Sequence, residues 1–321
     1  MSTPAENSYL HDNKALLRSF FTRKFRPAKP WHDLEFYCKF LVRCCVYPRV
    51  SLSYLNQLIN LASLPDIIAR QGLMPAKIHR PYLFTSLNVW QRARAIISHY
   101  QLLSDLEQPA LLRVLEARNA MTLVSWQGKN DELISLAIRT AQFDREGELM
   151  LDMYFQQHLI TTLTFSLSKI ESDNAALCIG GLQGPRTYLN NDIIKEATKA
   201  CYGLFPKRIL LEMACLLAKA CGIQRVFAVG DQVHVLRGKR YIRSKKGKLH
   251  ASYSEFWESI GAELTDQGVY TFDIDLERKS LEDIASKKRA EYRRRYQLLD
   301  DLQQQLNQVI GRHDESEDAA A

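Results

Sequence analysis

A glycine-rich segment in the middle of the chain has the composition of an anion-binding loop. Gly180, Gly181 and Gly184 lie in and after the apolar segment CIGGLQG, which predicts a buried strand and its exit. Glycines let backbone amides approach a phosphate group, and the N-terminus of a following helix adds a favourable dipole. The spacing matches neither a P-loop nor a dinucleotide-binding motif, so a plain tight turn is the alternative interpretation. Arg186, Lys207 and Arg208 follow it in sequence and would add positive charge, with simple solvation as the alternative.

Three polar side chains near this loop are candidates for proton transfer. Asp231 and His234 follow a predicted strand, and His250 follows a basic segment. An imidazole can act as a general base near neutral pH. A structural or surface role is the alternative for each residue. The chain has no GxSxG segment, and no serine or cysteine stands in a recognisable nucleophile motif.

The cysteines form no pattern typical of a metal site or a disulfide framework. Their number is odd, they include no CxxC pair, and no His/Cys spacing is typical of zinc. Most lie among apolar residues, so we expect reduced, buried thiols and no bound metal. The seven are Cys38, Cys44, Cys45, Cys178, Cys201, Cys215 and Cys221.

The formal net charge of +7 is concentrated in three segments. Residues 14–49 hold nine Lys or Arg against two acids, residues 237–248 hold seven and no acid, and residues 287–295 hold six against one acid. Such clusters attract anions, including nucleic acid and anionic lipid. No zinc-finger, RNP or helix-turn-helix pattern is present, so nucleic acid is not the expected partner. An RNA-binding regulator would rest on the basic clusters alone.

The last basic cluster lies on a predicted helix, residues 284–309, beside Tyr292 and Tyr296. Mixed basic and aromatic residues suit contact with an anionic lipid surface or another polyanion. A solvated helix face is the alternative. The residues in question are Lys287, Lys288, Arg289, Arg293, Arg294 and Arg295.

Hydrophobic periodicity divides the chain into a helical region (1–115), a mixed α+β domain (116–275), a basic C-terminal helix (276–310) and a disordered tail (311–321). The predicted fold is α+β, with the helical region packed on a mixed, largely antiparallel sheet with flanking helices. Strands are predicted at residues 121–126, 133–140, 149–155, 159–167, 175–180 and 226–229, and a basic hairpin at 233–243. Helices are predicted at 192–202 and 207–221.

Neither end of the chain, nor its most apolar stretch, predicts export or a membrane anchor. The N-terminal residues contain no apolar core of signal-peptide length. The stretch from Ile209 to Ile223 is interrupted by Glu212 and Lys219 and is too short to span a bilayer. We therefore expect a cytoplasmic protein, peripheral at the inner membrane, rather than a periplasmic one.

Four segments carry a resemblance to a known family. CIGGLQG (178–184), ATKACYGLFPKR (197–208), EFWESIGA (255–262) and IASKKRAEYRRRYQLLD (284–300) resemble the VirK/YbjX family of enterobacterial proteins, and the resemblance extends from residue 31 to about residue 300. It implies a virulence-associated accessory factor in envelope remodelling and resistance to cationic antimicrobial peptides. It also implies support for the production or surface localisation of an autotransporter such as VirG. It implies no catalytic residues.

The order of the predicted elements is also similar to the GNAT-like acyltransferase fold. An antiparallel meander, a strand leaving into a glycine-containing loop, a helix, a strand and the segment YSEFWESIGAE follow one another. In that fold the amides of the loop hold the pyrophosphate of acyl-CoA at a helix N-terminus. The similarity therefore implies, as the alternative function, an acyl-CoA-dependent acyltransferase acting on an envelope component.

Overall fold

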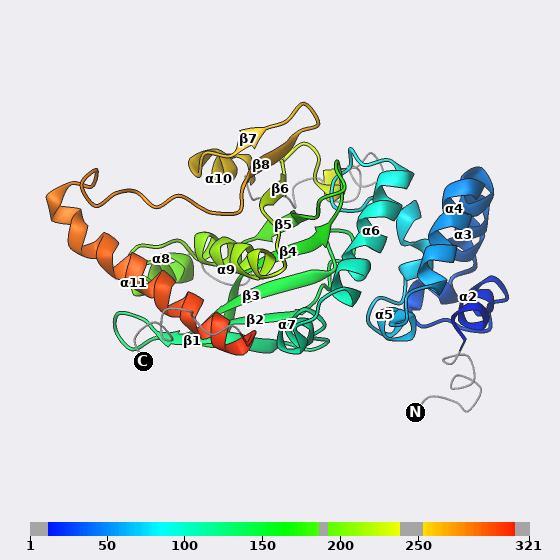
Figure 1. Ribbon diagram of the computed structural model, residues 1–321, viewed down its shortest axis with the longest axis horizontal. Helices are drawn as coiled ribbons and strands as arrows, with labels where there is room; N and C mark the ends of the chain where they lie inside the picture. The colour runs from blue at the N-terminus through cyan, green and yellow to red at the C-terminus, as the bar shows by residue number, and fades with distance from the viewer. Residues whose placement is uncertain (1–11, 186–191, 238–252, 312–321) are drawn as a thin grey trace.

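The computed structural model describes residues 12–185, 192–237 and 253–311. Its centre is an eight-stranded mixed sheet with the strand order β1-β2-β3-β4-β5-β6-β8-β7 (Figure 1). Neighbouring strands are antiparallel except for β5 and β6, which are parallel. The strands are β1 (Met121–Gln127), β2 (Leu133–Thr140), β3 (Leu149–Phe155), β4 (His158–Ser168), β5 (Ala176–Gln183), β6 (Arg225–Val229), β7 (Glu263–Leu264) and β8 (Val269–Asp273).

The two faces of the sheet differ in polarity. On β3, Leu149, Leu151 and Met153 alternate with Met150 and Asp152, because successive side chains of a strand point to opposite faces. The apolar set lies on the face covered by α9 and α11. The other face, toward the N-terminal helices, carries buried hydroxyls of β4 as well as Asp152. These hydroxyls belong to Thr162, Thr164, Ser166 and Ser168.

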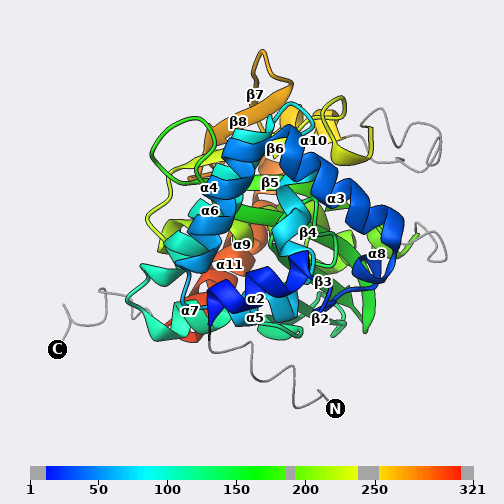
Figure 2. The same ribbon diagram turned by 90° about the vertical axis from the view of Figure 1, so that its right-hand side faces the viewer.

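The N-terminal helices cover the polar face in two layers. Figure 2 shows α6 nearest the sheet, with α3 and α4 outside it. Helix α6 begins at a capping box in which Asn88 and Gln91 exchange hydrogen bonds. The elements are α2 (Asn13–Phe21), η1 (Lys29–His32), α3 (Leu34–Val46), α4 (Pro48–Ile59), α5 (Leu64–Arg70), η2 (Met74–His79), α6 (Val89–Ser104) and α7 (Pro109–Leu115).

The apolar face is covered by helices from the second half of the chain. Helix α9 (Pro206–Ala220) starts with proline in its first turn, where no amide is needed, and packs on β3, β4 and β5. Helix α11 (Ser286–Val309) packs against β1 and α9, and Leu302 and Leu306 on it are fully buried. The remaining helices are α8 (Asp192–Ala200), α10 (Tyr253–Ser259) and the short η3 (Val235–Arg237).

The α+β class and the arrangement of helices around a mixed sheet are confirmed. Strands β2 and β3 match their predicted ranges to the residue. The prediction of a basic hairpin is wrong for its first strand. Residues 235–237 form a 3-10 helix, and His234 makes only an isolated bridge to Phe84. The rest of that hairpin and residues 312–321 of the predicted disordered tail lie outside the described residues. Within the described part of the chain, no helix combines the length and apolar character needed to cross a membrane.

Candidate functional site at the end of the parallel strand pair

The parallel strands β5 and β6 are unequal in length. Their ladder pairs three residues, Leu177, Cys178 and Ile179, with Val226, Phe227 and Ala228. Strand β5 then continues through residues 180–183, whereas β6 ends at Val229. The sheet therefore changes its pairing after Ile179. Gly180 lies at a register shift without a partner on β4, and residues 181–183 pair with β4 alone.

The three predicted loop glycines occupy two different environments. Gly180 and Gly181 are buried inside β5, and a Cβ on either would collide with Glu146. The Gly180 position faces the Glu146 carbonyl, and the Gly181 position faces its carboxylate. Gly184 is exposed, and a Cβ there would meet no atom within 4 Å. The first two glycines thus make room for Glu146, and only Gly184 presents its backbone to solvent.

Glu146 is a buried carboxylate that lies against the part of β5 that extends beyond its pairing with β6. Its side chain is 4% exposed. The Gln183 amide donates to both carboxylate oxygens, at 2.9 and 3.1 Å. The Nε2 atom of His234 lies 3.4 Å from Oε1 of Glu146. Neither Glu146 nor Gln183 was predicted as a site residue, because neither stands in a recognisable motif.

The hydrogen bonds of His234 fix its tautomer. Its Nδ1 atom accepts from the Leu236 amide at 3.3 Å, which leaves Nε2 as the nitrogen that carries a proton. Nε2 is buried and makes no hydrogen bond within the described residues, although Oε1 of Glu146 lies 3.4 Å away. The ring is buried and stacks on Tyr253, with centroids 5.2 Å apart. Because Nδ1 is engaged by a backbone amide, the Glu146 carboxylate is the group of this pair that can accept a proton.

The other predicted catalytic and anion-binding residues are placed less centrally. Asp231 accepts from the backbone amides of Tyr253 and Ser254, at 2.9 and 3.4 Å, at the start of α10. Lys207, in the first turn of α9, has its pKa lowered by burial, an effect that Asp231 partly offsets. Arg208 forms an ion pair with Glu212 at 2.7 Å. The predicted residues outside the described ranges are Arg186 and His250.

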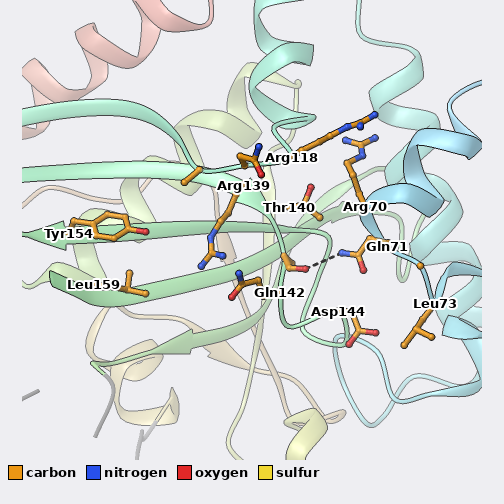
Figure 3. Close-up of a pocket in the computed structure, with 14 residues that line it drawn as sticks. Arg70, Gln71, Leu73, Arg118, Arg139, Thr140, Gln142, Asp144, Tyr154 and Leu159 are labelled. Carbon is orange, nitrogen blue, oxygen red and sulfur yellow. Dashed lines mark hydrogen bonds between the residues drawn. The ribbon is translucent and has the colours of Figure 1, made fainter. Parts of the chain in front are cut away.

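A polar cleft opens on the N-terminal side of the sheet. It encloses about 860 Å³ and lies between the segment after α5 and strands β2 and β3 (Figure 3). Figure 3 shows Arg139 extending toward Gln142 across the floor of this cleft, and Gln71 donating to the Ala141 carbonyl. Besides Arg139, two other arginines, Arg70 and Arg118, line it.

The positive charges of the cleft are balanced by acids. Arg139 donates to Asp152 at 2.6 Å, and Asp152 also accepts from Thr162 at 2.6 Å. The remaining pairs are Arg70–Glu116, Arg118–Asp66 and Arg80–Asp144. The cleft therefore presents paired, oriented hydrogen-bonding groups rather than excess positive charge.

A row of polar residues connects this cleft with Glu146. Asp152, Thr162 and Gln183 are register partners on β3, β4 and β5. Arg139 contacts Asp152 at one end of the row, and Gln183 donates to Glu146 at the other. The cleft and the buried carboxylate are thus two ends of one polar surface.

A second buried carboxylate, Glu148, belongs to the packing of the N-terminal helices. Its oxygens accept from Lys77 at 2.6 Å, Tyr82 at 2.9 Å and Tyr100 at 2.7 Å. Burial alone would raise the pKa of Glu148, but the Lys77 ammonium and the other donors outweigh it and lower that pKa. This cluster joins η2 and α6 to the sheet, so we assign it a structural role.

Two arginines of the basic helix α11 bind groups within the protein. Arg295 donates to the Tyr202 carbonyl at 2.6 Å and pairs with Glu291. Arg289 donates to the carbonyls of Ile284 and Glu282, at 2.9 and 3.3 Å. The exposed cations of the cluster are Lys287, Lys288, Arg293 and Arg294. Within the described ranges, no group of His, Cys, Asp or Glu is arranged to hold a metal ion.

Comparison with known proteins gives consistent matches. Residues 29–308 match the family described as protein of unknown function (DUF535). The chain is 36% identical to the uncharacterized protein YbjX of Escherichia coli K12, over 95% of this chain and 91% of that protein. It is 30% identical to an uncharacterized protein of Haemophilus influenzae, over 56% of this chain and 57% of that protein. A second Haemophilus influenzae protein is 35% identical over 41% of this chain and 44% of its own length.

Proposed function

The chain belongs to the DUF535 family, and from that premise we propose that it is an acyl-CoA-dependent acyltransferase acting on an envelope component. In the cell this activity would serve envelope remodelling, resistance to cationic antimicrobial peptides and the surface localisation of an autotransporter. We further propose that it acts at the inner-membrane surface. The family resemblance supports these roles, and the site supports the chemistry.

The observation that carries the proposal is the single parallel strand pair of the sheet. An antiparallel meander leads into β5, and a crossover that contains α9 connects β5 to β6. The last residues of β5 extend beyond the end of β6. The order of these elements is similar to that of the GNAT-like fold, in which the amides of the loop after such a strand hold the cofactor pyrophosphate at a helix N-terminus. A likeness of fold alone does not establish an activity, so the argument depends on the side chains at this position.

The residues present fit an acyl-CoA in part. Gly184 has an open backbone, and half-buried Lys207 supplies a cation at the start of a 15-residue helix. Gly180 and Gly181 do not fit a phosphate, because Glu146 fills the space beside them. When bound, the cofactor would supply a thioester carbonyl as the electrophile. Lys207 and the backbone at Gly184 would hold its phosphates.

The chain's own contribution to chemistry is proton handling by Glu146. A general base must lie near the nucleophile of the acceptor and keep a fixed orientation. Gln183 fixes the Glu146 carboxylate through two hydrogen bonds, and the Nε2–H of His234 faces the same group. We assign to Glu146 the removal of the proton from the acceptor's hydroxyl or amine.

Calorimetric titration of the full chain with acyl-CoAs of different length, and with an acyl carrier protein, tests the proposal. Gly184→Asp places a negative charge in open space, so it should abolish binding by repelling phosphate without disturbing the fold. Gly184→Ala is the matched control and should bind like the unmodified chain. If no acyl donor binds, or Gly184→Asp binds as tightly as Gly184→Ala, the proposal is wrong.

A further inference from the structure

An apolar surface without a covering element lies on the outer helix of the N-terminal region. Helix α3 exposes Leu34 at 57%, Val42 at 60% and Val46 at 61% of their surface. Cys38 and Cys45 are exposed between them. Spacings of three and four residues place such positions on one side of a helix. We call these five residues the α3 face.

The α3 face is part of a larger concentration of exposed apolar residues. Among the described residues, eleven large apolar side chains are exposed, and six of these lie between residues 21 and 52. Tyr47, 46% exposed, follows α3 directly in the chain, and Leu52, 63% exposed, lies on α4, which packs against α3. Scattered exposed apolar residues need no explanation, but a contiguous group indicates an interaction surface.

The same end of the molecule is strongly basic. Residues 14–49 contain nine Lys or Arg and two acids, a formal difference of +7. One of the two acids, Glu35, already pairs with Lys39. Among the exposed cations here are Lys24, Lys29 and Arg49. Figures 1 and 2 show α2, α3 and α4 together at one end of the molecule, away from the sheet.

We propose that the α3 face and its surrounding cations dock the protein on an anionic lipid bilayer. An amphipathic helix with apolar residues on one side and cations around it lies in the interface of such a bilayer. A second copy of the chain is a poorer occupant, because two surfaces carrying a +7 excess repel each other. The inference is independent of acyl transfer, since docking requires only the lipid surface.

Vesicle flotation tests the inference with the full chain. Vesicles of phosphatidylglycerol and phosphatidylethanolamine should recover the protein at low salt, because anionic lipid attracts the cations and salt screens this attraction. Phosphatidylcholine vesicles, which carry no net charge, should not recover it. The double variant Val42→Glu/Val46→Glu should reduce recovery at least tenfold. The control Phe205→Glu/Leu264→Glu adds the same charge at equally exposed sites, 64% and 60%, outside the N-terminal helices and should float like the unmodified chain.

A second measurement does not depend on any apolar-to-acid substitution. An environment-sensitive fluorophore attached to the exposed thiols Cys38 and Cys45 should shift to the blue when anionic vesicles are added. The inference fails if no shift occurs while the protein floats, or if Lys287→Glu/Arg294→Glu on α11 abolishes flotation and the α3 variant does not. It also fails if light scattering shows a dimer that Val42→Glu/Val46→Glu converts to monomers.

Discussion

The backbone carbonyl of Glu146 occupies the space that a Cβ on Gly180 would need. Through this contact, the turn before β3 packs against the part of β5 that extends beyond its pairing with β6. It also holds the Glu146 side chain at the point where β5 and β6 part. The position of the proposed base therefore depends on a glycine that sequence analysis assigned to a phosphate loop.

Gly180→Ala should destabilise the protein, whereas Gly184→Ala should not. The added methyl group at residue 180 would have to displace backbone, and overpacking of this kind costs about 3 kcal/mol. At residue 184 the methyl group enters open space. Urea denaturation followed by circular dichroism measures both free energies of unfolding. Equal stability of the two variants would contradict the described packing.

Lys77→Met should lower the free energy of unfolding by far more than the loss of one hydrogen bond would. Lys77 and Glu148 are both almost fully buried, so the substitution leaves a carboxylate without its counterion. Breaking such a pair costs about 3–5 kcal/mol. The double variant Lys77→Met/Glu148→Gln should recover part of this loss, because the uncompensated charge is removed. A double variant no more stable than Lys77→Met alone would show that the charge of Glu148 is not the cause.

The stability of the protein should fall as the pH decreases from about 6.5 to about 4 because of His99. Burial lowers the pKa of this histidine from 6.5 to about 4, and its Nδ1 atom accepts from the Leu167 amide at 3.2 Å. The unfolded chain binds a proton in this range and the folded chain does not, so acid favours unfolding, by an amount on the order of 3 kcal/mol. Above pH 6.5 both states are neutral and the effect vanishes.

Denaturant titrations at pH 7.5, 6.0 and 5.0 measure the slope, and His99→Gln provides the comparison. Glutamine keeps an acceptor for the Leu167 amide but does not titrate. The variant should therefore show a shallower fall in stability than the unmodified chain. His158, an exposed histidine at the start of β4, is the matched control, and His158→Gln should leave the slope unchanged.

Glu146→Gln should separate binding from chemistry if the proposed acyl transfer occurs. Loss of a general base slows the chemical step by about 10²–10⁴-fold. The dissociation constant for acyl-CoA should stay the same, because phosphate contacts are assigned to Lys207 and Gly184. Glu107→Gln, at an exposed carboxylate, is the control and should retain full activity. A Glu146→Gln variant as active as this control would exclude Glu146 as the base.

The sheet could be predicted well from local pattern, but its polar interior could not. Hydrophobic periodicity predicted the limits of β2 and β3 correctly. Strand β5 was predicted to end at residue 180, because glycines usually mark an exit. Its continuation to Gln183 depends on pairing with β4 and on Glu146, which is 34 residues earlier than Gly180.

The candidate site was predicted only in part for the same reason. His234 was recognised by its residue type, but its partners Glu146 and Gln183 come from a turn and a strand distant in sequence. The cleft of Arg139 combines residues from α5, the segment after α7 and strands β2, β3 and β4. No local spacing brings such residues together, and only the packing of the N-terminal helices on the sheet does so.

The edges of the sheet have a consequence for how copies of this protein can meet. At one edge, the Gln305 side chain of α11 accepts a hydrogen bond from the Ser125 amide of β1, at 3.1 Å. At the other edge, β7 is only two residues long. Exposed edge strands can pair with strands of other molecules, which leads to aggregation. Both edges here are obstructed, so self-templated fibre growth is disfavoured, and shortening α11 before residue 305 would expose β1 to it.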